Sequence, residues 1–474
     1  MPRHLAALSA MALSLVAPQW AGATTYTRDE AVRIALEKSS DVKTAEEEVI
    51  SANSQVDAGY GNALPSIDLD ATVTRIFGLD DVKKTTDLTD AAKGMADQQD
   101  DNGHPNANAY DQNVIGPAMD GLIYGMKSQG YRWQSSVGLT ATQILYAQGK
   151  VGTGIEIAKA YKHVKEVNLE NTKANVRYNV ENAFDQLIFL DSSIVILHQS
   201  KDMLQENLNF VEQGLKSGMM TELDLIRIQL KMDQLNSQIN STEKKRVLAR
   251  NALLNTMGLE WESEVMFQGD LRDPLQGYTY PDTSMANVKK RRKELVMLEA
   301  SEEMLQKNVS IEEGGYKPTL VLVGGLKYSN NKNHFYQWDA PDWDDNINKY
   351  VALNLKLNLF NGMKTKEAVV QAKSNLRSTQ IQKETAERGF RVQIESCANT
   401  LEDANSQIEI AKRQIDLAQK NYDLTNDSYK LGRETQLNLL TAENDLRTAK
   451  IGYMQAIVNW NQAYNALLQA TGEY

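Results

Sequence analysis

Hardly any residues in this sequence have the type and spacing that catalysis requires. The five histidines never fall in the His-Glu-x-x-His pattern that puts two imidazoles on one helix face to bind zinc. No serine or cysteine stands in the tight turn that exposes a nucleophile. The single cysteine, Cys397, excludes an intramolecular disulfide and a multi-cysteine metal site. The sequence therefore predicts a protein that is not an enzyme, with no catalytic residues, no cofactor and no metal ion.

Two segments are similar to ligand-binding motifs but differ from them at the residues that bind. The glycine-rich run Gly149–Gly154 lacks the length of a phosphate-binding loop and its closing Lys-Ser/Thr pair, so it is interpreted as a hinge between a strand and a helix. The run Asp100–Gly103 resembles a calcium loop. In that register the loop begins at Gln98 and ends at Ala109, where acidic ligands are needed, so we interpret it as a solvated loop.

The composition indicates an acidic, elongated chain. Over 474 residues the formal net charge is −11, which disfavours nucleic-acid binding because that requires a basic surface. Aromatic residues make up 7% and the mean hydropathy is −0.47, both low for a globular chain with a large core. The N-terminus predicts export. Arg3 precedes the apolar stretch 5–17, and small residues at 21–23 suit a signal peptidase, so the mature chain is expected to begin at Thr24.

Apolar residues recur at alternating steps of four and three in two long tracts without proline. A sustained seven-residue period of this kind is typical of coiled coils. The first tract runs from Val176 to Val211 and the second from Phe390 to Tyr422, with Cys397 on its apolar seam as an inert residue. From Leu439 to Leu467 large residues recur every seven positions, and an alanine follows each by three.

The two tracts are copies of one another. The shift that superimposes them is 214 residues, the separation of Gly218 from Gly432, and it also superimposes Thr221 on Thr435. Similarity between unrelated coiled coils would match the seams but not these glycines, so we infer a duplicated helical hairpin. Each glycine is expected to end a helix at positive φ, and each threonine to cap the next one.

Strand-like alternation of apolar and polar residues precedes each hairpin. It covers 67–74, 132–142, 320–328 and 351–359, with aromatic residues at the strand ends. Two-sided strands of this length fit a transmembrane barrel, apolar toward lipid and polar toward a lumen. Four strands cannot close a barrel, and an open edge in lipid leaves backbone groups unsatisfied, so we expect copies of the chain to share one. Two copies would supply eight strands, and three would supply twelve.

These patterns predict eight segments. They are a signal peptide (1–23), a first-repeat helix (24–62), a first β-hairpin (63–148) with a long extracellular loop (78–130), a first long α-hairpin (149–258), a connector (259–283), a second-repeat helix (284–316), a second β-hairpin (317–361) with an extracellular loop (330–348), and a second long α-hairpin (362–474).

This order resembles the TolC-like outer-membrane efflux proteins over essentially the whole mature chain. The motifs that carry the resemblance are Gly218-x-x-Thr221-x-Leu-Asp-Leu and Tyr429-x-x-Gly432-x-x-Thr435-x-Leu-x-Leu-Leu, each at a hairpin turn. The resemblance implies a mixed α and β fold that assembles as a homotrimer: a 12-stranded β-barrel in outer-membrane lipid, continued by a 12-helix periplasmic α-barrel. It also implies that the helical tips dock onto a periplasmic adaptor protein and an inner-membrane transporter.

In that family the second turn often supplies aspartates that ring the tunnel entrance, and here the sequence departs from the pattern. Asn438 and Thr441 occupy those places, whereas the first turn keeps Asp224, followed by Arg227. Asp224 could either line a cation-attracting mouth or only favour the helix dipole. The expected tip and entrance residues are Gly218, Thr221, Asp224, Arg227, Gly432, Arg433, Glu434, Thr435, Asn438 and Thr441.

Arg433 and Glu434 have two interpretations: partners that hold an entrance closed between helices, or a solvated helix cap. At the level of function the resemblance implies a passive exit channel of a tripartite efflux pump that exports small molecules. A close variant is the channel of a type I protein secretion system. The alternative of another class is an exported, non-conducting coiled-coil scaffold, which would not explain the apolar strand faces.

Overall fold

The computed structural model describes residues 24–77, 132–261, 265–272, 277–332, 334–339, 341 and 346–474. The expected signal peptide and the expected loop 78–130 lie outside these residues. The chain divides into two compact units. One comprises Met1–Val56, Glu156–Asn308 and Val370–Tyr474, and the other comprises Asp57–Ile155 and Val309–Val369.

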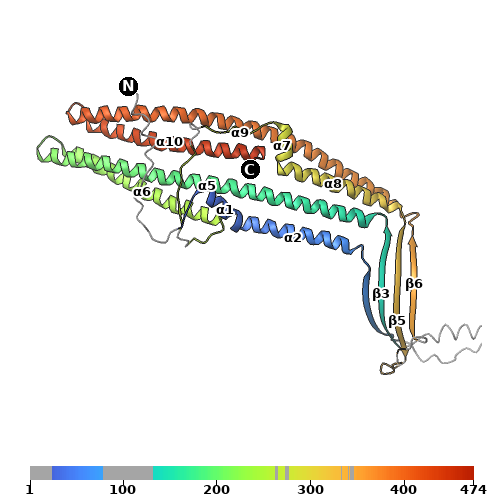
Figure 1. The fold of residues 1–474 in the computed structure, drawn as a ribbon. Helices are drawn as coiled ribbons and strands as arrows, with labels where there is room; N and C mark the ends of the chain where they lie inside the picture. Colours follow the sequence, from blue (N-terminus) through green and yellow to red (C-terminus); the bar gives the residue numbers. More distant parts are fainter. Residues whose placement is uncertain are drawn as a thin grey trace, which may run out of the picture. The chain divides into compact units, whose positions relative to one another are not determined.

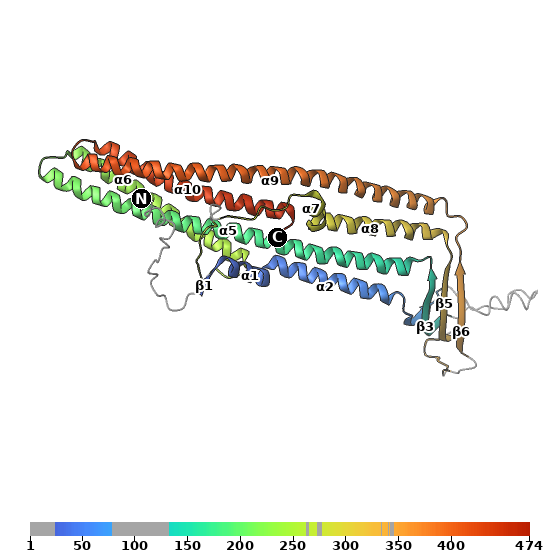
Figure 2. The same ribbon diagram turned by 45° about the horizontal axis from the view of Figure 1, so that its top comes forward.

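Long helices dominate the chain, and they are arranged as two hairpins (Figures 1 and 2). The elements are β1 (Thr24–Tyr26), α1 (Arg28–Lys38), α2 (Ser40–Gly61), β2 (Ser66–Arg75), β3 (Trp133–Ala147), α5 (Lys150–Lys216), α6 (Glu222–Thr256), β4 (Val265–Phe267), α7 (Met285–Arg291), α8 (Lys293–Glu313), a 3₁₀ turn (Gly314–Tyr316), β5 (Thr319–Lys332), β6 (Ile347–Lys356), α9 (Lys364–Lys430) and α10 (Gln436–Thr471). Helices α5 and α9 each contain 67 residues, which is about 100 Å of α-helix. The predicted fold class, a duplicated unit of β-hairpin and long α-hairpin, is confirmed.

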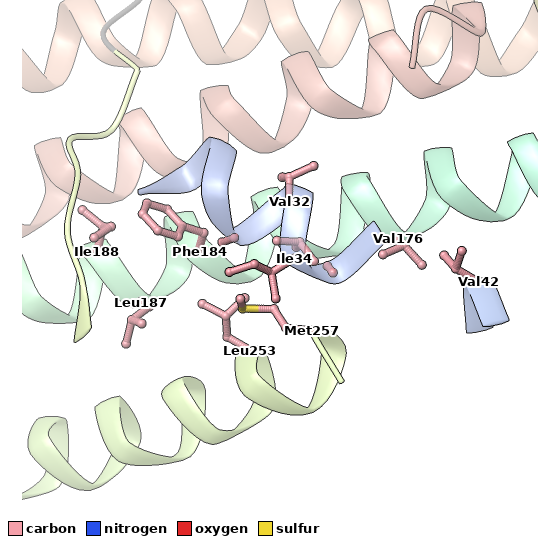
Figure 3. Close-up of a cluster of buried hydrophobic side chains, with 12 residues drawn as sticks. Val32, Ile34, Val42, Val176, Phe184, Leu187, Ile188, Leu253 and Met257 are labelled. Carbon is pink, nitrogen blue, oxygen red and sulfur yellow. The ribbon is translucent and has the colours of Figure 1, made fainter. Parts of the chain in front are cut away.

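The apolar seams predicted from the sequence hold the helices together. The buried residues of these seams include Val180, Leu187, Leu197, Leu204, Val211, Ile394, Leu401, Ile408, Leu446, Trp460 and Leu467. In one cluster Phe184 of α5 packs with Ile34 of α1 and Leu253 of α6 (Figure 3). A second cluster joins α5 and α6 to Leu440 of α10, and a third joins α9 to α10. The four long helices therefore lie in the order α6, α5, α10, α9.

Two stretches expected to form single helices are interrupted. Residues 24–62 form β1, α1 and α2, with the break at Ser39, where ψ is 136°. Strand β1 pairs in parallel with β4, which brings the start of the described chain to the connector. Residues 284–316 are likewise divided at Arg292, whose buried guanidinium lies 3.8 Å from the centroid of the Phe390 ring and donates to the Ala470 carbonyl.

The predicted strands form one antiparallel sheet in the order β2, β3, β5, β6. Directly opposed residues share a face, so the register fixes two different surfaces. One face carries apolar side chains from all four strands: Ile67, Leu69, Val73, Val137, Leu139, Leu322, Leu326, Val351, Leu353 and Leu355. The other is mostly polar. The apolar face is uncovered in the single chain, since Leu69 is 72% and Val351 79% exposed.

None of the helices in the described ranges combines the length and the apolar character needed to cross a membrane.

Candidate functional site

The first candidate site is the pair of turns that join α5 to α6 and α9 to α10. Gly218 (φ 76°) and Gly432 (φ 69°) both adopt the left-handed conformation, which confirms the expectation from the repeat. Met219 N–H donates to the Gly214 carbonyl (2.8 Å), and Arg433 N–H donates to the Ser428 carbonyl (2.8 Å). These bonds satisfy the last carbonyls of each incoming helix.

Thr221 and Thr435 cap the outgoing helices, as predicted, but only the first cap is reciprocated. The Thr221 hydroxyl accepts from Asp224 N–H (3.2 Å), and the Asp224 carboxylate accepts from Thr221 N–H (3.1 Å) and from the Thr221 hydroxyl (2.6 Å). In the second turn Thr435 accepts from Asn438 N–H (3.3 Å). Of the two hairpin turns, only the first therefore has a complete capping box, at the start of α6.

Asp224 acts in this structure as a capping carboxylate near the positive end of the α6 dipole. Its other oxygen lies 3.9 Å from the Arg227 guanidinium. This geometry matches the helix-dipole alternative, while its role at a tunnel entrance stays a prediction. In the second turn the carboxylate comes from Glu434, which accepts from the Asn438 amide (2.6 Å) and from Thr435 N–H (3.3 Å). The exposed Arg433 lies beside it in sequence, and the Thr441 hydroxyl donates to the Leu437 carbonyl (2.8 Å).

The two turns are also joined to each other through residues that the sequence patterns did not single out for this role. The Gln436 side chain donates to the Asp224 carbonyl (2.9 Å), which ties α10 to the first turn of α6. The rings of Phe210 and Tyr429 meet at a centroid distance of 5.6 Å, and the Tyr429 hydroxyl lies 4.0 Å from the sulfur of Met220. Tyr429 belongs to the family motif, but no local periodicity distinguishes Gln436 or Met220.

The difference between the two caps leads to a stability prediction. Thr221→Ala removes the hydroxyl and leaves the Asp224 carboxylate with one fewer donor, so it is expected to destabilise the hairpin by about 1–2 kcal/mol. Thr435→Ala, the matched change in the other repeat, is expected to cost roughly half of that because its cap has no return bond from the third residue. Hydrogen exchange at the first turns of α6 and α10 measures both effects. Equal protection losses would contradict the asymmetry.

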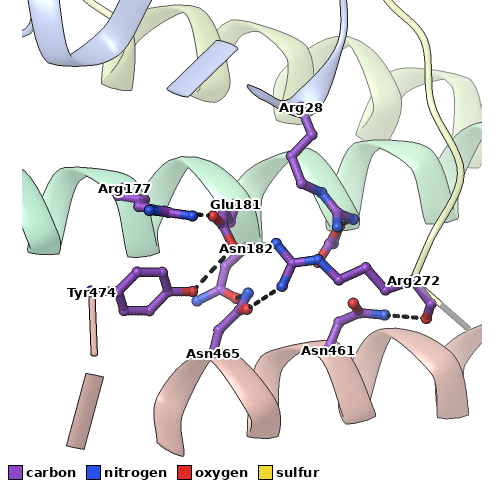
Figure 4. Close-up of polar contacts among 9 residues, drawn as sticks. Arg28, Arg177, Glu181, Asn182, Arg272, Asn461, Asn465 and Tyr474 are labelled. Carbon is purple, nitrogen blue, oxygen red and sulfur yellow. Dashed lines mark hydrogen bonds and ion pairs between the residues drawn. The ribbon is translucent and has the colours of Figure 1, made fainter. Parts of the chain in front are cut away.

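A second candidate site is a polar cluster between α5, α10, the connector and the C-terminal Tyr474 (Figure 4). Glu181 is buried and accepts from Arg177 (3.0 Å), Arg272 (2.8 Å) and the Tyr474 hydroxyl (3.1 Å). Arg272 also donates to Asn465 (3.1 Å), so it links the two hairpins. Burial and the nearby Glu181 carboxylate raise the pKa of the Tyr474 phenol.

One helical turn after Glu181, Asp185 is fully buried and forms an ion pair with Arg28 of α1. Burial raises the pKa of Asp185 to about 6, because desolvation outweighs the attraction of Arg28 and Arg272. Farther along α5, a similar contact joins Ser200 to the buried Glu443 of α10, and burial raises the pKa of that carboxyl as well. The contacts of Arg272 and of Ser200 connect the two hairpins, and the Asp185–Arg28 pair connects α5 to α1.

Groups of three or more His, Cys, Asp or Glu side chains arranged to hold a metal ion do not occur among the residues that the structure describes. Cys397 is partly buried on the α9 seam, and desolvation raises the pKa of its thiol.

Comparison with known proteins gives a consistent result. The family model described as "Outer membrane efflux protein" matches residues 31–259 and 285–473. The outer membrane efflux protein BepC of Brucella suis biovar 1 (strain 1330) is 21% identical over 352 residues, covering 72% of this chain and 73% of BepC.

Solved structures share the fold at low sequence identity. CusC superimposes with a TM-score of 0.73 at 15% identity, covering 94% of this chain and 92% of CusC. VceC of Vibrio cholerae gives 0.69 at 13% identity, with 94% and 96% covered. The CmeC channel of Campylobacter jejuni gives 0.70 at 15%, with 94% and 85% covered.

Proposed function

Because the chain belongs to the outer membrane efflux protein family, we propose that three copies form the exit channel of a tripartite efflux pump for small molecules. Membership confirms the resemblance inferred from the sequence. The chain is an outer-membrane efflux channel with a periplasmic helical part, a transport protein and not an enzyme. We propose in addition that the chain assembles as a homotrimer and associates with a periplasmic adaptor protein and an inner-membrane transporter.

The outer helices of the four-helix array support association with further copies. Helix α9 carries a second apolar stripe with a seven-residue period, formed by Ile410, Leu417 and Leu424 and continued by Leu431 just after the helix, and all four side chains are exposed in the single chain. At the other side of the array, α6 exposes Leu223, Ile226 and Leu230. Sustained heptad stripes favour a partner helix, and a ring of copies would place α6 of one against α9 of the next.

The sheet supports the same conclusion, and it provides the observation on which the proposal mainly rests. Among the residues that the structure describes, strands β2 and β6 each pair with one neighbouring strand only, so both edges present unpaired backbone groups beside an exposed apolar face. Such an edge is unfavourable in water and more so in lipid, where no solvent can satisfy it. Three copies supply twelve strands, enough to close a barrel around an aqueous lumen.

The hairpin turns are suited to contact other proteins. Met219 in the first turn is 77% exposed, and Leu431 in the second turn and Leu437 in the first turn of α10 are also exposed. Exposed apolar side chains at the end of a helical array are typical of a protein interaction site. We propose that the adaptor and the transporter engage the array here.

Reconstitution tests the proposed channel. The protein purified in detergent is expected to migrate as a trimer that heating converts to monomers, and to give stepwise single-channel currents in planar bilayers. A non-conducting scaffold would be extracted by salt and give no currents. A detergent-free, monodisperse single protomer would contradict the proposal.

A further inference from the structure

We propose that neighbouring copies meet edge to edge through β6 and β2 in a register that puts Lys356 of one copy beside Asp68 of the next, on the polar face of the sheet. This inference rests on the proposed trimer and adds to it the residues that set its register. The occupant of each open edge is therefore a second copy of this chain.

The charges on the two edge strands are complementary. On the polar face, β2 carries Asp68 and Asp70, and β6 carries Lys356. All three residues are exposed in the single chain. Asp68 accepts from the Ser66 hydroxyl at 3.2 Å, and its nearest partner across the sheet is the neutral Thr140. One edge is thus acidic and the other basic at the same end of the strands.

The observed register fixes the level of each residue across the sheet. Ser66 of β2 stands opposite Thr142 of β3, which stands opposite Val323 of β5, which stands opposite Ala352 of β6. If the copies formed a ring without any stagger, Ala352 of one copy would stand opposite Ser66 of the next. Lys356, four residues beyond Ala352, would then have no strand residue opposite it.

Closing a barrel removes this mismatch because the strands must tilt. With twelve strands tilted by about 35–45°, the return is staggered by roughly four to six residues per copy. The stagger must be an even number of residues, because an odd number would put the apolar side chains of β2 on the same face of the sheet as the polar side chains of β6. The stagger can shift β6 along β2 of the next copy in one direction only. A shift in the opposite direction would place β6 beside the residues before Ser66, which lead into α2, and would leave most of β2 unpaired.

Both permitted values bring the charges together. A stagger of six puts Lys356 directly opposite Asp68, and a stagger of four puts it opposite Ser66 and diagonal to Asp68. Each trimer would then contain three such pairs. Pairing of β2 with a second β2 would instead bring carboxylates together, and a register that moved Lys356 away from the β2 carboxylates would lose this attraction, so the charges favour this alignment of the copies.

Cysteine crosslinking tests the register directly. In a Cys397→Ala background, Asp68→Cys or Ser66→Cys combined with Lys356→Cys is expected to give covalent dimers and trimers on a non-reducing gel, because disulfides form only when the Cα atoms are about 4–7 Å apart. Thr74→Cys with Lys356→Cys is the matched control and should stay monomeric on the denaturing gel. Crosslinking by the control pair alone, or trimers in which none of the three pairs crosslinks, would overturn the proposed register. A protein that forms no trimer at all would instead overturn the proposed function.

Charge reversal tests the pairing. Asp68→Lys or Lys356→Asp alone is expected to lower the fraction of heat-sensitive trimer about fivefold, and the double exchange should restore it. Lys327→Asp is the control, a reversal of the same kind on the same face but in the inner strand β5, and it should leave the trimer fraction unchanged. Failure of the double exchange to restore trimer, or an equal loss in the control, would overturn the pairing.

Discussion

Replacing Trp460 with alanine is expected to destabilise the helical unit by about 3–5 kcal/mol, the range for deleting a buried tryptophan. Trp460 is 1% exposed between α9 and α10. Its ring stacks on Tyr464 (5.2 Å between centroids, 6° between planes) and meets Tyr278 of the connector edge-on at 5.0 Å. The indole N–H also donates to the Asn405 side chain (2.6 Å), so alanine would leave both a cavity and an amide without its donor.

The measurement is the thermal midpoint of the helical circular dichroism signal in detergent. A chain of this length loses roughly 1 °C for each kcal/mol, so a decrease of about 3–5 °C is expected. Trp261→Ala provides the control, since that side chain is 67% exposed and its loss should change the midpoint little. Equal decreases for the two variants would show that Trp460 does not hold α10 against α9.

The sequence predicts the helices and strands well because their patterns are local. All residues of a heptad seam lie on one face of the helix and pack against the same neighbour. The seams around Leu401 and Leu446 are therefore recognisable from their period alone, without any knowledge of the partner helix. The glycines at positive φ are recognisable for a different reason: the duplication shows each of them twice, at Gly218 and Gly432. Strand alternation likewise identifies the apolar face of the sheet.

Contacts between distant segments could not be predicted in this way. Arg272 lies in a connector without periodicity, yet it bonds Glu181 and Asn465 from two different repeats. At the break in the second-repeat helix, Arg292 stacks on Phe390, almost a hundred residues away in sequence. Such residues are selected by packing partners that are brought close only in the folded chain, and a single sequence carries no signal of them.

The buried Asp185 should make the stability of the protein depend on pH in an unusual direction. An ordinary aspartate has a pKa of 3.8, and in the folded protein that of Asp185 is about 6. The folded state therefore binds a proton more readily than the unfolded state. The contribution of Asp185 to the free energy of unfolding is largest below about pH 4, falls as the pH rises toward 6, and is lost above pH 6. The difference of about two pKa units corresponds to about 3 kcal/mol.

Asp185→Asn removes this titration. As the pH rises from 4 to 7, the free energy of unfolding of the variant is expected to increase by about 3 kcal/mol relative to that of the wild type. This change with pH does not depend on what the substitution itself costs at pH 4. The groups that face Asp185 are Arg28 from α1, Arg272 from the connector and Glu181 from its own helix. Arg28 lowers the pKa, so Arg28→Gln should extend the fall in stability to higher pH, and the double variant should show neither change.

Thermal midpoints of the four proteins between pH 4 and pH 8 measure the effect, and only differences from the wild type are compared, because other groups titrate in the same range. Above pH 6 Asp185 is charged, and its ion pair with Arg28 offsets only part of the cost of burying the carboxylate, whereas in acid the neutral carboxyl is buried without that cost. If the wild type and Asp185→Asn run parallel across the whole range, burial does not govern this carboxyl and the ion pair with Arg28 compensates its desolvation in full.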